Sequence, residues 1–332
     1  MKIAYLGAGA WGFCLASLLA SKGYRVVSWT KNRELAEKLN SGGEHPHLAG
    51  HHPLKGMHFT TDLAEALKGA EAIVEGVTTA GLRPVFQSVK EIITPKCPII
   101  ITSKGIEQNT EMLLPEVAVQ VFGEKARNTI GFLSGPSYAQ EVIRNLPTSV
   151  VGTAFSQETI STVCDLFTTQ SFRVYPNADI VGVAYGGALK NIIAIACGIC
   201  EGLNLGNSAK AALMTRGLHE IKKLAVAKGA KPDTLTGLSG MGDVCLTCGS
   251  LLSRNCRYGY LLAQGLTPKE AEKKIEMVVE GVYSCLSALQ IGKHLNIPLP
   301  ITEMVYKIVY EGMNPKDAVK GLMQRTIKEE HL

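Results

Sequence analysis

Hydrophobic residues in the first half of the chain form short apolar runs that alternate with amphipathic helical patterns. The runs predict strands at residues 2–6, 25–29, 72–77, 98–102 and 129–133, and the patterns predict helices at 13–20, 62–67, 84–93 and 111–121. Apolar strands that alternate with helices are typical of βα units, which build a mainly parallel sheet covered on both faces. The expected fold class is therefore α/β, a Rossmann-like doubly wound sheet with ligands at the carboxyl ends of its strands.

In the second half the strand signals fade from about residue 179 and helical periodicity takes over. Long helices are expected at 180–201 and 207–228, and shorter ones near 243, 254, 269, 282, 301 and 315. A chain of 332 residues is long enough for two cores. We expect an α/β domain over residues 1–185, followed by an all-α domain over residues 186–332.

The first of these long helices carries an isolated charge. Between Asp179 and Glu201 the residues are apolar or small apart from Tyr185, Lys190 and Asn191. A buried ammonium needs a paired charge or a lowered pKa, and either can make an amine useful in acid or base chemistry. The alternatives are a lysine that reaches the surface and a helix that crosses a membrane. Because a lysine in mid-span costs about 2.5 to 3.5 kcal/mol on insertion scales, we expect no membrane insertion.

The net charge and the composition of the chain limit the kinds of molecule that it is expected to bind. The formal net charge is +5, the basic residues are scattered, and 6% of the residues are aromatic. This composition favours local anion sites over a nucleic-acid surface. A strand pattern begins at residue 2 with no targeting pattern before it, so we expect a cytoplasmic location.

Cysteine and histidine residues raise the question of a metal. The nine cysteines are scattered, which favours reduced thiols. Cys197 with Cys200 and Cys245 with Cys248 have CxxC spacing, but the gap between the pairs far exceeds the ~15 to 20 residues of a zinc ribbon. Five histidines lie in the loop 45–58, where metal ligation is the alternative to a solvated or cofactor-facing loop. We expect no metal site.

The residues after the first strand predict a dinucleotide site. Gly7, Gly9 and Gly12 form a GxGxxG motif between a strand and a helix, which suits a tight turn, a close approach to pyrophosphate and helix packing. After the second strand, Lys31 and Arg33 stand where an NAD enzyme usually has an acid. Two cations suit a 2′-phosphate, so we expect NADP or NAD with NADPH favoured. The alternative is that both cations begin the next helix in solvent.

Other candidate residues lie at strand ends and helix starts. Lys104 and the segment 134–137 follow two predicted strands. In the helical half, Asp243 follows a glycine pair, the segment 253–255 supplies a hydroxyl, a guanidinium and an amide, and Glu280 begins a helix. These groups suit a phosphate ester or a cofactor phosphate. Turn chemistry, helix capping and the helix dipole are the structural alternatives.

Taken together, the chain resembles the NAD(P)-dependent glycerol-3-phosphate dehydrogenases of the bacterial type. Eight motifs follow the order of that family: GAGAWG at 7–12, SKGIE at 103–107, SGPSYAQE at 134–141, GGALKNIIAI at 186–195, TRGLHE at 215–220, GMGDVCLTC at 240–248, SRN at 253–255 and VVEG at 278–281. The resemblance implies reversible hydride transfer between NAD(P)H and dihydroxyacetone phosphate. The product, sn-glycerol 3-phosphate, would feed phospholipid synthesis, and the enzyme would be a homodimer.

The resemblance also implies residue roles. Lys190 would be the proton donor and acceptor. The implied substrate contacts are Lys104, Gly135, Ser137, Lys190, Asp243, Ser253, Arg254 and Asn255. The implied cofactor contacts, besides Gly7, Gly9 and Gly12, are Ala10, Trp11, Lys31, Lys104, Ala139, Arg254 and Glu280.

Two segments depart from the family pattern. Thr78-Thr79 replaces a Pro-Ser pair, and His47-Leu48-Ala49 replaces a Tyr-Leu-Pro loop. Both lie on the cofactor side and bear on cofactor affinity and loop order. Two other functions remain open: a dehydrogenase of the same plan that acts on a hydroxyacid or sugar acid, and a dinucleotide-sensing protein without activity.

Overall fold

The computed structural model describes residues 1–327, 329 and 330, so the predicted end of the all-α domain at 328, 331 and 332 lies outside the described residues. The chain divides into two compact units. The first comprises Met1–Lys104 and Leu114–Ile180, and the second comprises Gly105–Leu113 and Val181–Leu332. The predicted boundary between residues 185 and 186 lies within a single helix, Ile180–Gly202, and no sequence pattern indicated that Gly105–Leu113 joins the second unit.

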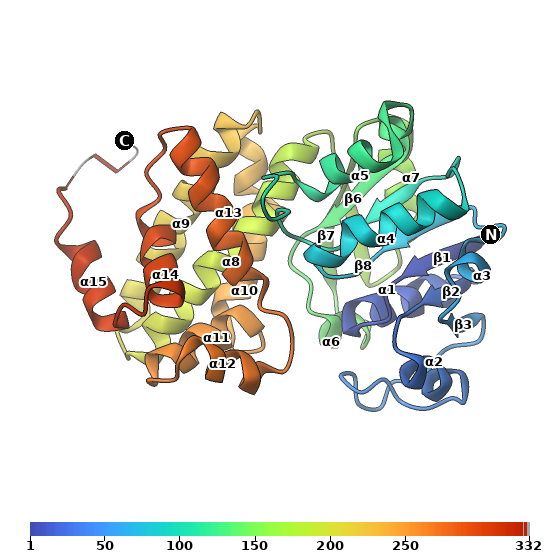
Figure 1. Ribbon diagram of the computed structural model, residues 1–332, viewed down its shortest axis with the longest axis horizontal. Coiled ribbons are helices and arrows are strands. Elements are labelled where there is room, and N and C mark those ends of the chain that lie inside the picture. The colour runs from blue at the N-terminus through green and yellow to red at the C-terminus, as the bar shows by residue number, and fades with distance from the viewer. Residues whose placement is uncertain (328, 331–332) are drawn as a thin grey trace. The chain divides into compact units, whose positions relative to one another are not determined.

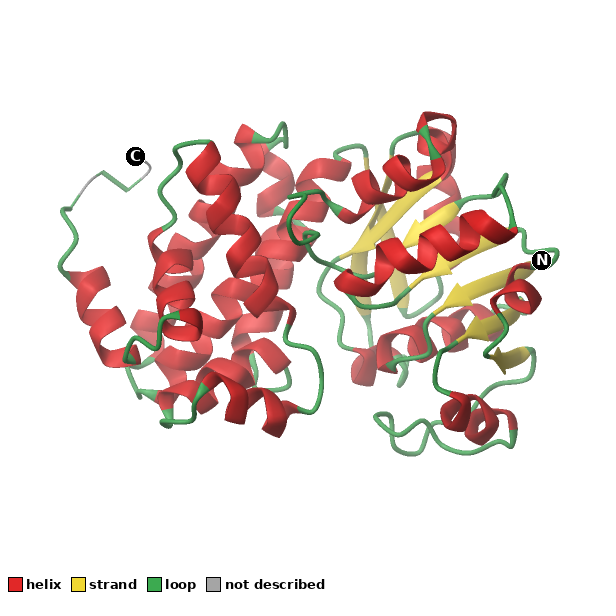
Figure 2. Cartoon of the chain, in the orientation of Figure 1, coloured by secondary structure: helices red, strands yellow, loops and turns green. Residues whose placement is uncertain are grey.

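The first unit is built on one eight-stranded sheet in the order β3-β2-β1-β4-β5-β6-β7-β8 (Figures 1 and 2). Its strands are β1 Lys2–Leu6, β2 Arg25–Trp29, β3 Met57–Thr60, β4 Ala72–Glu75, β5 Ile99–Ile101, β6 Ile130–Ser134, β7 Thr148–Ala154 and β8 Phe172–Asn177. Every pair is parallel except β6 with β7. In the register of the central strands, Leu6 and Ile101 lie opposite Glu75. The predicted Rossmann-like sheet is confirmed, with one antiparallel pairing added.

Three strands, β3, β7 and β8, were not predicted from the hydrophobic pattern. β3 and β8 are the two edges of the sheet, and β8 contains Pro176, which a central strand would not tolerate. Edge strands are short or polar because only one side pairs, so their apolar signal is weak. β7 has Gly152 and small residues in place of a run of large apolar ones.

Helices cover both faces of this sheet (Figure 2). They are α1 Ala10–Ser21, α2 Arg33–Asn40, α3 Leu63–Leu67, α4 Thr79–Ile92, α5 Leu114–Phe122, the short 3₁₀ helix η1 Glu124–Thr129, α6 Ala139–Val142 and α7 Gln157–Phe167. Three of the predicted helix starts were wrong. α1 begins at Ala10, three residues before the predicted start. α4 begins at Thr79 and carries Pro84 in its interior, and α5 begins only at Leu114 because Glu111 has a left-handed backbone with φ 59°.

The second unit is helical, as predicted. Its elements are α8 Ile180–Gly202, α9 Asn207–Ala227, η2 Pro232–Thr236, the single π-turn η3 Leu238–Gly242, α10 Asp243–Gly249, α11 Arg254–Ala263, α12 Pro268–Ile275, α13 Glu280–His294, α14 Pro300–Tyr310 and α15 Pro315–Met323. By length and composition α8 could span a membrane, but 89% of its most apolar window is buried. α8 is thus the core helix of this unit.

Glycines let the backbones of α8 and α11 meet closely. A Cβ on Gly198 would lie 1.9 Å from the carbonyl oxygen of Cys256, and one on Gly259 would lie 2.0 Å from that of Ile195. No side chain fits at either point, so the two helices can approach this closely only with glycine there.

This contact predicts a large loss of stability for Gly259→Ala. We expect about 3 kcal/mol of destabilisation, because the added methyl group meets backbone that cannot move alone. Gly249→Ala is the matched control, since no heavy atom lies within 4 Å of a Cβ there. Denaturant unfolding of both variants tests the contact, and equal stability of the two would contradict it.

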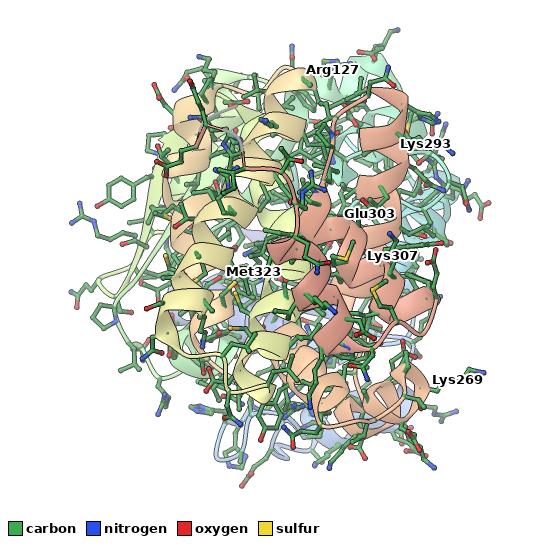
Figure 3. The ribbon with its side chains drawn as sticks, turned by 90° about the vertical axis from the view of Figure 1, so that its left-hand side faces the viewer. Arg127, Lys269, Lys293, Glu303, Lys307 and Met323 are labelled. Atoms are coloured by element: carbon green, nitrogen blue, oxygen red, sulfur yellow. The ribbon has the colours of Figure 1, made fainter. Side chains whose placement is uncertain are left out.

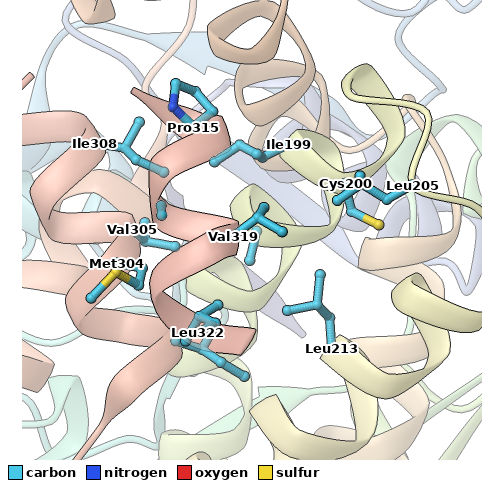
Figure 4. Close-up of a pocket in the computed structure, with 13 residues that line it drawn as sticks. Ile199, Cys200, Leu205, Leu213, Met304, Val305, Ile308, Pro315, Val319 and Leu322 are labelled. Carbon is cyan, nitrogen blue, oxygen red and sulfur yellow. The ribbon is translucent and has the colours of Figure 1, made fainter. Parts of the chain in front are cut away.

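α14 shows how the helical unit divides its apolar and polar faces. Lys307 donates to Glu303 at 2.7 Å on an accessible face (Figure 3). Met304, Val305 and Ile308 instead line an apolar pocket that α15 covers with Val319 and Leu322 (Figure 4). All residues that line this pocket are apolar, so it offers no partner for a charged ligand.

Candidate functional site

The glycine-rich turn of the first unit has the geometry of a phosphate cradle. Gly7 has φ 116°, and a Cβ there would lie 2.7 Å from the carbonyl oxygen of Gly76. Gly9 precedes α1 without a capping side chain, and no heavy atom lies within 4 Å of where its Cβ would be. The free N–H groups of the first turn of α1, which includes Ala10, Trp11 and Gly12, are therefore open to an anion. These residues fit the pyrophosphate of a dinucleotide.

The two cations after β2 differ in their surroundings. Lys31 is exposed in the turn before α2. Arg33 donates to Glu37 at 2.7 Å, and Asn32 caps α2 by accepting from the backbone N–H of Leu35 at 2.9 Å. Arg33 is thus engaged within α2, and Lys31 is the better placed of the two to meet a 2′-phosphate.

The histidine-rich loop is attached to the glycine-rich turn. His45 is buried, its Nε2 lies 3.0 Å from the carbonyl oxygen of Ala8, and its ring packs on Phe13 with centroids 4.9 Å apart. The Nδ1 of His45 accepts from the backbone N–H of His47 at 3.3 Å, so Nε2 is the protonated nitrogen. Burial lowers the pKa of His45, which keeps the ring neutral. The sequence did not distinguish His45 from the other four histidines of this loop.

The ends of β5 and β6 bring three of the predicted residues together. The Lys104 ammonium donates to the carbonyl oxygen of Gly135 at 2.8 Å, and the Ser137 hydroxyl donates to the same oxygen at 3.2 Å. Gly135 has φ 148° and its Cα hydrogens face Val150, where a Cβ would lie 2.8 Å from backbone. Ala139 begins the short helix α6, two residues after Ser137. This cluster belongs wholly to the first unit.

In the second unit Lys190 is buried in a network of three side chains. Its relative exposure is 8% and that of Asp243 is 0%. The Lys190 Nζ donates to Asp243 Oδ1 at 2.5 Å and to Thr247 Oγ1 at 2.9 Å, and Thr247 donates to the same carboxylate at 3.2 Å. Lys190 and Asp243 were both candidates from the sequence, whereas Thr247 was missed. The feature of the sequence that could have indicated Thr247 is its i,i+4 spacing from Asp243 on α10.

The start of α11 holds the predicted Ser253, Arg254 and Asn255 in three different roles. Ser253 caps the helix, since its hydroxyl accepts from the backbone N–H of Cys256 at 3.3 Å. Asn255 donates to Asn191 Oδ1 at 3.0 Å and accepts from the N–H of Gly281 at 2.8 Å. It therefore ties α8 to the first turn of α13, next to Glu280.

Arg254 is a partly buried cation without a fixed partner. Within the part of the chain that the structure describes, its guanidinium makes no hydrogen bond and no ion pair. Burial lowers the pKa of Arg254, and the nearby charge of Glu280 acts against that shift. Since an arginine stays protonated in proteins, its positive charge is available to an anion.

The cysteine pairs do not form a zinc ribbon. The neighbouring Cys197 thiol and burial raise the pKa of the Cys248 thiol. Cys245 is exposed, whereas Cys200 is buried. No group of three or more His, Cys, Asp or Glu side chains that could hold a metal occurs among the described residues.

Comparisons with known proteins match the whole chain to one family. Two protein-family models match, described as the N-terminus and the C-terminus of NAD-dependent glycerol-3-phosphate dehydrogenase, over residues 2–160 and 179–320. A glycerol-3-phosphate dehydrogenase [NAD(P)+] of Protochlamydia amoebophila is 63% identical over 331 residues, which covers 100% of this chain and 99% of that relative. One from Chlamydia caviae is 53% identical with the same coverage. A crystal structure of glycerol-3-phosphate dehydrogenase from Coxiella burnetii has a TM-score of 0.92 and 36% identity, and covers 98% of this chain and 99% of the other.

Proposed function

This chain belongs to the NAD-dependent glycerol-3-phosphate dehydrogenase family, and from that premise we propose how its residues reduce dihydroxyacetone phosphate to sn-glycerol 3-phosphate. It is an NAD(P)-dependent oxidoreductase with a reversible hydride-transfer reaction. The observation that carries the assignment of residues is the buried network of Lys190, Asp243 and Thr247. The same unit holds Arg254, a cation that has no hydrogen bond or ion pair among the described residues.

Lys190 is the proposed proton donor. Reduction of a ketone leaves a negative charge on its oxygen, which must be neutralised as it forms. The Lys190 ammonium supplies both a positive charge and a proton, and in the reverse direction the neutral amine takes the proton from the alcohol. Asp243 and Thr247 hold the amine in place and compensate its burial. When bound, the reduced nicotinamide supplies the hydride.

The remaining proposed substrate contacts form two groups. Arg254, with Asn255 and Ser253 beside it, would bind the phosphate group, because a guanidinium gives charge-assisted hydrogen bonds to phosphate oxygens. In the first unit the proposed contacts are Lys104, Gly135 and Ser137, which already share one hydrogen-bonded cluster. Binding energy from the phosphate would orient the reacting carbonyl.

The proposed cofactor contacts begin with the glycine-rich turn. Gly7, Gly9 and Gly12, with Ala10 and Trp11, would hold the pyrophosphate through backbone N–H groups. The other proposed contacts are Lys31, Lys104, Ala139, Arg254 and Glu280. In this assignment residues 1–185 bind NAD(P) and residues 186–332 carry the substrate chemistry.

The assay that tests this function follows NADPH and NADH oxidation separately. We expect turnover with dihydroxyacetone phosphate and far less with unphosphorylated dihydroxyacetone or with a keto acid. Preference for a keto acid would favour the hydroxyacid alternative, and binding of cofactor without turnover of any substrate would favour a sensing protein.

Lys31 gives a specific prediction about cofactor choice. Lys31→Ala should lower kcat/KM for NADPH about tenfold and change that for NADH less than twofold, because only NADPH has a 2′-phosphate. Arg33→Ala is the comparison, with a smaller effect because Glu37 already engages that guanidinium. Equal losses with both cofactors would remove Lys31 from 2′-phosphate binding.

The cellular setting is part of the proposal. We propose a cytoplasmic homodimer with no nucleic-acid partner and no membrane insertion, whose product enters glycerophospholipid synthesis. The burial of α8, the one strongly apolar long helix among the described residues, supports the absence of a membrane span. Sedimentation of the purified enzyme would test the dimer.

A further inference from the structure

A buried carboxyl group lies at the end of β4 where the dinucleotide is proposed to bind. Glu75 is the last residue of β4 and is fully buried. One of its carboxylate oxygens accepts from the backbone N–H of Val77 at 2.6 Å, and the other accepts from the Ser103 hydroxyl at 2.7 Å. Glu75 therefore joins the loops that follow two neighbouring strands, β4 and β5.

Each of these loops touches a part of the proposed cofactor site. In the loop after β4, the carbonyl of Gly76 lies against Gly7, the first glycine of the phosphate turn. In the loop after β5, Lys104 follows Ser103 directly and donates to the carbonyl of Gly135. The hydrogen bonds of Glu75 thus fix the spacing between the glycine-rich turn and the loop of Lys104.

The charge of Glu75 has no other compensation. Among the described residues it makes no ion pair, so its hydrogen bonds alone offset burial. Burial raises the pKa of Glu75 to about 7, and the hydrogen bonds from Ser103 and Val77 act against that rise. The titratable group that faces it from β1 is Tyr5, whose pKa burial raises far above its usual value, so Tyr5 stays neutral. An apolar residue would complete β4 without this cost.

We propose that Glu75 is a positioning residue of the cofactor site, whose ionised carboxylate holds the loops after β4 and β5 in the geometry that binds the dinucleotide. The inference rests on the proposed function of the first unit. Protonation weakens the Glu75 carboxyl group as an acceptor for its two donors, the Val77 N–H and the Ser103 hydroxyl, so the loops should loosen as the pH falls through about 7.

The test is the affinity for NADH between pH 6 and pH 8.5, measured by fluorescence titration of the full chain. NADH is the probe because it lacks the 2′-phosphate, which itself titrates near pH ~6. Wild-type affinity should fall about tenfold from the high to the low end of this range. Glu75→Gln should bind weakly at every pH, near the wild-type value at low pH. Ser103→Ala, which removes one donor, should lose affinity about threefold at high pH.

Glu220→Gln is the matched control. Glu220 is buried in the second unit, accepts from the backbone N–H groups of Ile301 and Thr302, and burial raises its pKa to about 7 as well. This variant should keep the wild-type pH profile for NADH. His45 is present in every variant, so the difference between wild type and Glu75→Gln isolates Glu75.

Several outcomes would overturn the inference. Wild-type affinity of Glu75→Gln at each pH, or a loss in Glu220→Gln equal to that in Glu75→Gln, would show that Glu75 does not position the site. If Glu75→Gln does not fold, the NADH affinity of Ser103→Ala becomes the test. Wild-type NADH affinity in that variant at high pH contradicts the inference. Failure of the wild type to bind NADH or NADPH would instead refute the proposed function.

Discussion

Replacement of Lys190 by alanine should lower kcat with dihydroxyacetone phosphate about a thousandfold or more, while NADH binding stays within about twofold. The reason is that the Lys190 ammonium is the proposed source of the proton for the developing alkoxide, and alanine carries neither that proton nor the charge. The glycine-rich turn lies in the other unit and does not depend on Lys190. Steady-state kinetics and NADH titration measure the two effects separately.

The same substitution should also destabilise the protein, which requires a control. Asp243 would be left as a buried carboxylate without its cation, at a cost of about 3 to 5 kcal/mol. The double variant Lys190→Met with Asp243→Asn removes both charges and should recover stability without recovering turnover. Retained turnover in either variant, once folding is verified, would remove Lys190 from the mechanism.

Replacement of Arg254 by alanine should lower kcat/KM for dihydroxyacetone phosphate about a thousandfold. The guanidinium is partly buried and has no partner in the described structure, so a bound phosphate is expected to take that place. Loss of one member of a desolvated charge pair typically costs about 2 to 5 kcal/mol. The effect should be much smaller with unphosphorylated dihydroxyacetone, which makes no such pair.

Arg257 is the natural control for this prediction. It lies one turn further along α11 and is exposed, so Arg257→Ala should keep kcat/KM within about twofold. If Arg254→Ala loses the same factor with phosphorylated and unphosphorylated substrate, Arg254 acts on the enzyme's structure and not on the phosphate.

The features that are best predicted from the sequence are those that depend on a local pattern of residues. β1 and β2 have the predicted bounds, because both are apolar runs ended by turn residues. α8 was predicted as a helix buried all round, and Lys190 stood out because a charge in such a helix needs a reason. The GxGxxG motif was informative because it lies between a strand and a helix.

Features that depend on distant parts of the chain could not be predicted in this way. Asn191 and Asn255 are 64 residues apart, and nothing local in either segment indicates that they bond. Glu75 looks like the polar end of a short strand, and only the fold shows that donors from another loop surround it. Pro84 misled the prediction of α4, since proline usually marks a first turn and here lies inside the helix.

The segment Gly105–Leu113 has a consequence for how the protein is made and divided. It is part of the helical unit, where Gln108 donates to the Tyr283 carbonyl and to the Ser287 hydroxyl, partners that lie 175 and 179 residues later. During synthesis the segment Gly105–Leu113 leaves the ribosome long before its partners in α13 have been made. The helical unit therefore cannot be complete before α13 has emerged. A single cut between residues 180 and 181 leaves the first unit whole but separates Gly105–Leu113 from the rest of the helical unit.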